Sequence, residues 1–237
     1  MSFFLRYQHP ILTYHRVGVP KGDPTVTVSE EGFQRQMALL KGQNQWIRLE
    51  ELIPLLQSET PPLPKRVAVT FDDGYAEIYT TVFPLIERYR IPVTVFLVTG
   101  WIGKGEFLSW EAVQEMSKKG VDFGSHTKSH LYLPAVMSRK ILGEEIRGSK
   151  EFLEDRIGKP VSLFSYPVGG FTEEVKELVQ EAGYKAAVTT NRGVQEEKRD
   201  LYALTRIKMT EASGSFWVFR MKTSGYYEQF QRKKKAY

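Results

Sequence analysis

Short apolar segments alternate with amphipathic ones along most of this chain, and this alternation limits the folds available to it. Strand-like runs are expected at Ile11–Tyr14, Trp46–Leu49, Val67–Phe71, Val93–Val98, Val121–Gly124, Ser162–Tyr166, Tyr184–Thr189 and Leu204–Met209. Helical periodicity predicts helices between these runs, at 29–40, about 50–57, 78–89, 109–119, 138–157 and 172–182. Strands that alternate with helices form a mainly parallel sheet covered by helices. At 237 residues, the pattern favours an open doubly wound sheet or a closed (β/α) barrel.

The composition excludes several classes of protein. The chain has no cysteine, which excludes a disulfide scaffold, a cysteine-ligated metal site and a cysteine nucleophile. The formal charge of +5 is mild, and the absence of a basic motif interleaved with aromatic residues predicts no nucleic-acid partner. The basic tail at 231–237 is interpreted as a solvated end, with an anionic surface as the alternative partner.

No segment predicts a membrane span, an export signal or a domain boundary. The longest apolar stretch, Ile91–Ile102, is interrupted by Pro92 and is shorter than the ~20 residues of a spanning helix. The apolar patch at the N-terminus ends at Arg6, too short for the core of a signal peptide, so a cytoplasmic protein is expected. Ser58–Pro64 resembles a linker most, but it is short and leads directly into a strand, so we expect a surface loop.

Side chains with metal-binding and acid–base chemistry follow the predicted strands. His15 follows the first strand, Asp72 and Asp73 follow Val67–Phe71, and His126 and His130 follow the strand that ends at position 124. Three of the four histidines of the chain therefore fall just after strands. Because the carboxyl ends of parallel strands meet on one face of such a fold, we expect these five side chains to lie together.

The two histidines of HTKSH predict a metal site when they are combined with an aspartate. His126 and His130 are four positions apart, which on a helical turn would put both rings on one face. That spacing alone is weak, and Asp-Asp-Gly alone is typical of a turn. Together, two imidazoles and one carboxylate form a three-ligand site with open positions for water and substrate. The second aspartate can then act as a general base.

Four motifs resemble those of the polysaccharide deacetylase family, which shares the NodB homology domain. They are TFDDGY at 70–75, HTKSH at 126–130, FSYPVGG at 164–170 and ILTYHRV at 11–17. The resemblance spans about 10–210. Within the family, the chain is similar to the branch that deacetylates poly-N-acetylglucosamine. It implies a distorted (β/α)7 barrel, with the whole chain, 1–237, as a single catalytic domain. It also implies a metal-dependent hydrolase that removes N-acetyl groups from amino sugars or polysaccharides by attack of metal-bound water.

The resemblance also assigns roles, position by position. The ligands of one divalent metal, with Zn²⁺ as the first expectation, would be Asp73, His126 and His130. Asp72 would be the general base. The turn that faces the oxyanion and the substrate would comprise Tyr166, Pro167 and Val168, with the backbone N–H of Val168 as an oxyanion donor.

The chain departs from the family pattern at three places. The usual catalytic acid is a histidine near the last strand, but no histidine follows His130, so His15 is assigned as the acid that protonates the leaving amine. The alternative for His15 is a buried histidine that structures the first turn. Ser165 stands where many members have an arginine that orients the base. Arg206 could replace that arginine or could form an ion pair at the surface or core edge. Val168 stands where an aromatic residue often follows the proline, which leaves the substrate preference open.

Aromatic side chains near these motifs are candidates for stacking on sugar faces. They are Tyr75, Trp101, Trp110 and Tyr166. For the two tryptophans, packing in the core is the favoured alternative.

Three other functions fit parts of the pattern. The same site could hydrolyse a non-sugar amide, imide or ureide, which the lack of an export signal favours. A non-catalytic carbohydrate-binding relict would explain the departures at Ser165 and Val168. A non-haem iron oxygenase shares two histidines and one carboxylate, but the second aspartate speaks against it.

Overall fold

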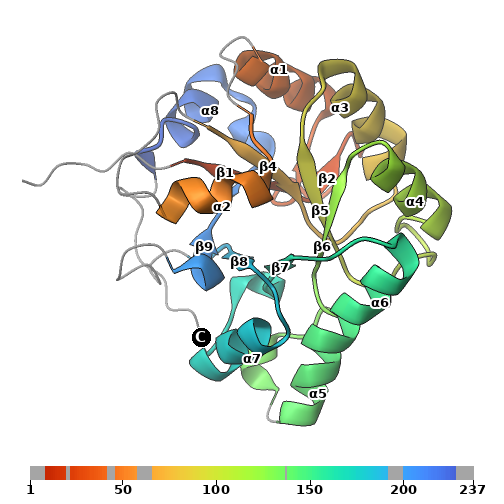
Figure 1. Cartoon of the computed structure of the whole chain (residues 1–237). Helices are drawn as coiled ribbons and strands as arrows, with labels where there is room; N and C mark the ends of the chain where they lie inside the picture. Colours follow the sequence, from red (N-terminus) through yellow and green to blue (C-terminus); the bar gives the residue numbers. More distant parts are fainter. Residues whose placement is uncertain are drawn as a thin grey trace, which may run out of the picture.

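A computed structural model of the chain describes residues 9–19, 22–41, 46–57, 66–136, 138–191 and 200–227. The predicted loop at Ser58–Pro64, the N-terminal patch and the basic tail lie outside these residues. Eight strands form one parallel sheet in the order β10-β1-β4-β5-β6-β7-β8-β9, which curls into a nearly closed barrel (Figure 1). Their bounds are β1 Ile11–Tyr14, β4 Ala68–Phe71, β5 Val93–Leu97, β6 Asp122–Ser125, β7 Leu163–Ser165, β8 Ala186–Thr189, β9 Leu204–Thr205 and β10 Ile207–Lys208.

The barrel closes through one short segment of chain. Strand β9 pairs with β8, and β10 pairs with β1, so the two ends of the sheet meet on either side of Arg206. If β9 and β10 are taken as one interrupted strand, the sheet has the seven strand positions of a distorted (β/α)7 barrel. The predicted fold class is therefore confirmed. A separate two-stranded sheet joins β2, Arg16–Val17, to β3, Thr27–Val28.

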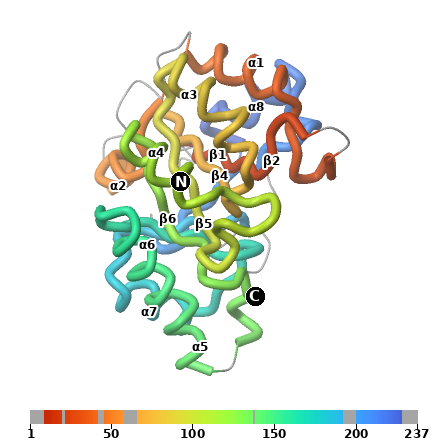
Figure 2. The backbone as a smooth tube through the Cα atoms, turned by 90° about the vertical axis from the view of Figure 1, so that its right-hand side faces the viewer, coloured from red at the N-terminus to blue at the C-terminus, as the bar shows by residue number. Residues whose placement is uncertain are grey.

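Helices surround the strands, with α1, α3 and α8 grouped on one side and α5, α6 and α7 on the other (Figure 2). The α-helices are α1 Glu30–Lys41, α2 Leu49–Gln57, α3 Phe83–Tyr89, α4 Trp110–Lys118, α5 Arg139–Gly143, α6 Ser149–Ile157, α7 Glu173–Glu181 and α8 Phe216–Lys222. Two π-helical segments, η1 Ile78–Val82 and η3 Glu144–Gly148, and four 3₁₀ segments, η2 Leu133–Ala135, η4 Pro167–Gly169, η5 Leu201–Ala203 and η6 Glu211–Gly214, complete them. Within the described ranges, we find no helix with the length and apolar character to cross a bilayer.

Side-chain caps explain where several helices begin. The hydroxyl oxygens of Ser109 and Thr172 accept hydrogen bonds from backbone N–H groups in the first turns of α4 and α7. These bonds satisfy donors that have no partner inside the helix. Both helices therefore begin where the sequence predicted.

Two predicted elements differ in the structure. The strand expected at Trp46–Leu49 is wrong, because only Trp46 makes an isolated bridge, to Val67, and helix α2 begins at Leu49. Leu49, Leu52 and Ile53 are buried at helical spacing, and this burial outweighs the short strand-like pattern. The long helix expected at 138–157 is interrupted by the π-helical segment η3 between α5 and α6.

On β1, β4 and β7, the side chains that face the barrel interior change from apolar near the amino end to polar near the carboxyl end. Ile11, Ala68 and Leu163, each at the start of its strand, belong to one buried cluster with Leu49 and Leu52 of α2. Helix α2 therefore covers the amino end of the barrel. Side chains point to the same face of a strand at every second position. The residues two positions further along these strands are Thr13, Thr70 and Ser165, and all three are buried. A polar layer therefore lies inside the barrel near its carboxyl end.

Candidate metal centre

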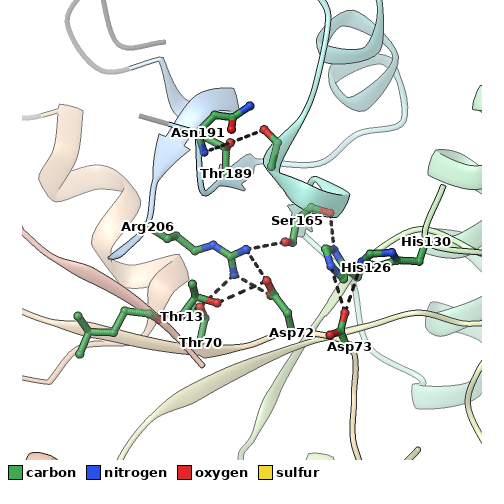
Figure 3. A network of polar contacts seen from close by, with 12 residues as sticks. Thr13, Thr70, Asp72, Asp73, His126, His130, Ser165, Thr189, Asn191 and Arg206 are labelled. Atoms are coloured by element: carbon green, nitrogen blue, oxygen red, sulfur yellow. Dashed lines mark hydrogen bonds and ion pairs between the residues drawn. The ribbon is translucent and has the colours of Figure 1, made fainter. Parts of the chain in front are cut away.

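The turn after β4 sends its two carboxylates in different directions (Figure 3). Asp72 points towards Arg206, and Asp73 points towards His126 and His130. Asp73 and Gly74 both have positive φ angles, 70° and 79°, which turn the chain sharply. A left-handed backbone at a non-glycine residue is uncommon and occurs often at functional sites. The local backbone thus places adjacent aspartates in separate environments.

Asp73, His126 and His130 converge on a common point. One ligand atom from each lies within 4.8 Å of the other two, and the Nε2 atoms of both histidines are 3.5 Å from Asp73 Oδ1. That oxygen is buried and has no hydrogen-bond partner among the described residues. A buried carboxylate oxygen without a donor, facing two imidazole nitrogens, is the arrangement that a divalent cation satisfies. The three residues therefore fit a metal, as the sequence predicted.

A second contact fixes the orientation of His126. Its Nδ1 lies 2.8 Å from the backbone oxygen of Ser165, at the end of β7. The carbonyl can only accept, so Nδ1 carries the proton and donates it, and Nε2 is left with its lone pair directed at Asp73. The ring is therefore held ready to act as a ligand.

The backbone of HTKSH is not the helical turn that the spacing suggested. Thr127 and His130 have φ angles of 69° and 59°, so the segment is a loop with two left-handed residues. The two histidine rings still meet, at 4.9 Å between centroids and an interplanar angle of 76°. The predicted proximity was right, and the predicted local conformation was wrong.

Burial disfavours the charged forms of the metal-binding groups when no cation is present. Burial, together with the charge of Asp72, raises the pKa of Asp73 to about 7. Burial lowers the pKa of His126 to about 4 and also lowers the pKa of His130. Neutral imidazoles are the form that binds metals, and a divalent cation would favour the ionised form of Asp73.

Asp72 forms a buried ion pair with Arg206. The guanidinium donates two hydrogen bonds to the carboxylate, at 2.7 Å and 2.6 Å, and the side chain of Arg206 is only 1% exposed. The guanidinium also donates to the hydroxyls of Thr70, at 3.1 Å, and Ser165, at 2.9 Å. Burial alone would raise the pKa of Asp72, but Arg206 holds that pKa well below its ordinary value. Asp72 is therefore ionised at neutral pH.

This geometry bears on the departure at Ser165. Arg206 reaches both Asp72 and Ser165 from the junction of β9 and β10. Its guanidinium therefore orients Asp72, although position 165 carries a serine. The alternative of a surface ion pair for Arg206 is excluded by its burial. The interior threonines Thr13 and Thr70 were missed by sequence reasoning. Their signal was a hydroxyl within an otherwise apolar strand.

His15 lies at the same end of the barrel but outside the three-residue cluster. Burial lowers its pKa to about 4, and the charge of Asp72 acts in the opposite direction. Its Nδ1 atom is buried without a hydrogen-bond partner among the described residues. His15 is therefore neutral at neutral pH, and its role as the acid stays a prediction.

The turn at Tyr166–Val168 presents a strained residue to solvent. Val168 has a φ angle of 58° and is 67% exposed. The hydroxyl of Thr189 holds the turn by donating to the backbone oxygen of Gly169 at 2.7 Å. A β-branched residue with positive φ is rare, and such strain persists only where the surroundings enforce it. The role of its N–H as an oxyanion donor stays a prediction.

Two of the aromatic candidates for sugar stacking pack against other parts of the protein, Tyr166 fully buried and Trp110 partly buried. The side chain of Tyr166 is 1% exposed, stacks on Phe171 and donates its hydroxyl to the backbone oxygen of Tyr202, so the expectation of a sugar contact for its ring is wrong. Trp110 packs against Phe152 of α6, as the core-packing alternative predicted.

The other two belong to a row of rings that ends at the metal site. Tyr75 stacks on Phe107 at 5.1 Å, Phe107 contacts Trp101 at 4.7 Å, and Trp101 stacks on His130 at 5.2 Å between ring centroids. The guanidinium of Arg16 lies 4.3 Å from the ring of Tyr75. Sequence reasoning missed Phe107 and Arg16, since nothing in the order of residues shows that their side chains meet. The row supports the ring of His130 from one side.

Comparison with known proteins bears on this site. A sequence profile described as polysaccharide deacetylase matches residues 59–187. YxkH of Bacillus subtilis (strain 168), a protein named only provisionally as a polysaccharide deacetylase, is 30% identical over 208 residues, which are 87% of this chain and 73% of that protein. The chain belongs to the polysaccharide deacetylase family.

Other members of the polysaccharide deacetylase family are similar in sequence and in fold. The poly-beta-1,6-N-acetyl-D-glucosamine N-deacetylase of Staphylococcus epidermidis is 28% identical over 226 residues, 83% of this chain and 77% of that protein. The structure of the deacetylase PplD of Streptococcus pyogenes in complex with acetate matches with a TM-score of 0.79 at 26% identity. The match covers 85% of this chain and 92% of that one. The family resemblance predicted from TFDDGY and HTKSH is confirmed.

Proposed function

We propose that this protein is a metal-dependent deacetylase of N-acetylated amino sugars, with Zn²⁺ as its cation and poly-N-acetylglucosamine as the first substrate to test. The observation that carries the proposal is the convergence of Asp73, His126 and His130 beside the Asp72–Arg206 ion pair. The similarity to the Staphylococcus epidermidis N-deacetylase supports the substrate class. A bound divalent cation would supply an activated water and polarise the amide carbonyl.

The side chains around the cation site have distinct proposed roles. Asp72, held ionised and oriented by Arg206, accepts the proton of the attacking water. The N–H of Val168 donates a hydrogen bond to the oxyanion that develops on the acetamide. His15, which burial keeps neutral at neutral pH, must first take up a proton; it then delivers that proton to the departing nitrogen, so that the C–N bond breaks to give acetate and a free amine.

Acetate release tests this function directly. The purified protein is incubated with N-acetylglucosamine oligomers in β-1,6 and β-1,4 linkage, with and without chelator, and acetate is measured. We expect acetate from at least one series, loss of release with chelator, and recovery when Zn²⁺ is added back.

Two results would contradict the proposal. Stoichiometric metal without acetate release from any oligomer, together with binding of the oligomers, would favour a non-catalytic carbohydrate-binding protein. Hydrolysis of small cyclic imides or ureides in place of sugar amides would assign the same site to a different substrate class.

A further inference from the structure

Glu145 is a buried carboxylate that the proposed chemistry does not use. It lies in η3, between α5 and α6, and is 4% exposed. Its Oε2 atom accepts hydrogen bonds from the backbone N–H groups of Lys128, at 3.0 Å, and Ser129, at 2.8 Å. No ion pair joins Glu145 to a basic side chain in the part of the chain that the structure describes. Burying a carboxylate without a counter-ion is costly, so the placement of Glu145 against these two N–H groups needs an explanation.

Those two N–H groups belong to the segment between the metal-binding histidines. Lys128 and Ser129 lie between His126 and His130. In this segment, Thr127 and His130 have left-handed backbone conformations. Left-handed conformations are unfavourable for residues with a side chain, so this loop needs contacts that hold it. The hydroxyl of Thr127 provides one, by accepting from the N–H of His130 at 3.0 Å. Glu145 provides two more from a different element.

The helix that carries Glu145 is itself fixed to the strand that carries His126. The hydroxyl of Ser149, at the start of α6, lies 2.7 Å from the hydroxyl of Ser125, the last residue of β6. Ser125 also accepts from the N–H of Thr127 at 3.2 Å. Glu145 and Ser149 are four positions apart, one on the π-helical segment and one just after it. π-Helical segments occur often at functional sites, where they change the direction of a side chain.

We propose that Glu145 is a positioning residue of the metal centre. It fixes the backbone between His126 and His130 through charge-assisted hydrogen bonds, which are stronger than those of a neutral acceptor. The inference rests on the metal site of the proposed function and is independent of the substrate.

Three variants test this role through metal affinity, which is measured without turnover. Glu145→Ala removes the acceptor and the charge, Glu145→Gln keeps an acceptor oxygen without the charge, and Glu144→Ala changes the exposed neighbour on the same segment. The dissociation constant for Zn²⁺ is measured by competition with a chromophoric chelator. The visible spectrum of the Co²⁺-substituted protein reports the ligand geometry, and thermal unfolding with chelator present reports whether each variant folds.

We expect Glu145→Ala to bind Zn²⁺ roughly 10–100-fold more weakly, as is typical when a residue that orients a metal ligand is removed. We expect a smaller loss for Glu145→Gln, a changed Co²⁺ spectrum for Glu145→Ala, and wild-type values for Glu144→Ala.

A folded Glu145→Ala variant with the wild-type dissociation constant and Co²⁺ spectrum would overturn the proposal. If that variant does not fold, Glu145→Gln decides, and wild-type affinity in it would overturn the proposal equally. The proposed deacetylation is judged separately by acetate release from the wild-type protein, so failure of one is distinguishable from failure of the other.

Discussion

Asp72 and Asp73 are neighbours in the chain, but their electrostatic environments shift their pKa values in opposite directions. Asp72 faces the Arg206 guanidinium, which keeps its pKa low, whereas burial and the charge of Asp72 raise the pKa of Asp73. One carboxylate therefore has a counter-ion within the protein, and the other lacks one. Two adjacent residues of the same type can thus divide the work between proton transfer and metal binding.

Asp72→Asn tests this division. We expect acetate release to fall by at least ~100-fold, since a general base contributes about that much, while bound Zn²⁺ remains stoichiometric. We also expect a loss of roughly 3–5 kcal/mol in the free energy of unfolding, because Arg206 is left buried without its counter-ion. Acetate release, metal analysis and denaturant unfolding measure the three effects. Asp155→Asn, on the exposed side of α6, is the control, and full activity in Asp72→Asn would refute the role of Asp72.

Trp101 tests whether the aromatic row supports the metal site. Its ring stacks on His130, so we expect Trp101→Ala to weaken Zn²⁺ binding by about 10-fold, as for other residues that orient a ligand. Trp110→Ala is the matched control, because Trp110 packs against α6 through Phe152. Competition with a chelator gives both dissociation constants. Equal constants in the two variants would assign Trp101 to core packing alone.

At the scale of single elements, the interior of the barrel leaves no space beside β6. A Cβ atom at Gly124 would lie 2.5 Å from the ring of Phe96 and 2.9 Å from the backbone oxygen of Leu163. The glycine therefore lets β5, β6 and β7 curve around the Phe96 ring. The guanidinium carbon of Arg206 lies 5.4 Å from the centre of the same ring.

Gly124→Ala should therefore destabilise the protein by about 1–3 kcal/mol through overpacking. Gly143→Ala is the control, since Gly143 is helical and an added Cβ would contact nothing there. For that variant we expect a gain of about 0.5–1 kcal/mol. Urea unfolding of both variants, compared at equal slope, checks the signs. Equal stability in the two variants would show that the interior yields more easily than its contacts suggest.

The topology of the fold predicted that the candidate ligands would meet, and the resemblance to the family predicted Asp73, rather than Asp72, as the carboxylate ligand. Parallel strands bring their carboxyl ends together, so Asp73, His126 and His130 met in space although their local conformations were unknown. The direction of a single side chain was harder to predict. Tyr166 turned inwards and Glu145 reached a loop from another element, and neither follows from periodicity along the chain. Trp46–Leu49 failed because a short apolar run fits a strand or a helix equally well.

At the scale of the whole molecule, the cation should contribute to folding as well as to chemistry. The three ligands come from the ends of β4 and β6, so a bound ion would tie separate parts of the barrel together. With free Zn²⁺ at about 100 times the dissociation constant, linkage adds about 2.7 kcal/mol to the stability. We expect chelator to lower the midpoint of thermal unfolding and added Zn²⁺ to restore it. An unchanged midpoint in the wild-type protein would argue against tight binding, and His126→Ala should show no response to Zn²⁺.

The junction of β9 and β10 is synthesised late, so the site is completed only after most of the chain has been made. Arg206 follows Asp72 by 134 residues, so a nascent chain exposes the carboxylate long before its counter-ion leaves the ribosome. The same five residues that carry Arg206 also join the first strand to β8. A chain that stops before position 204 would therefore leave the edges of β1 and β8 unpaired, and it would leave Asp72 without the guanidinium of Arg206.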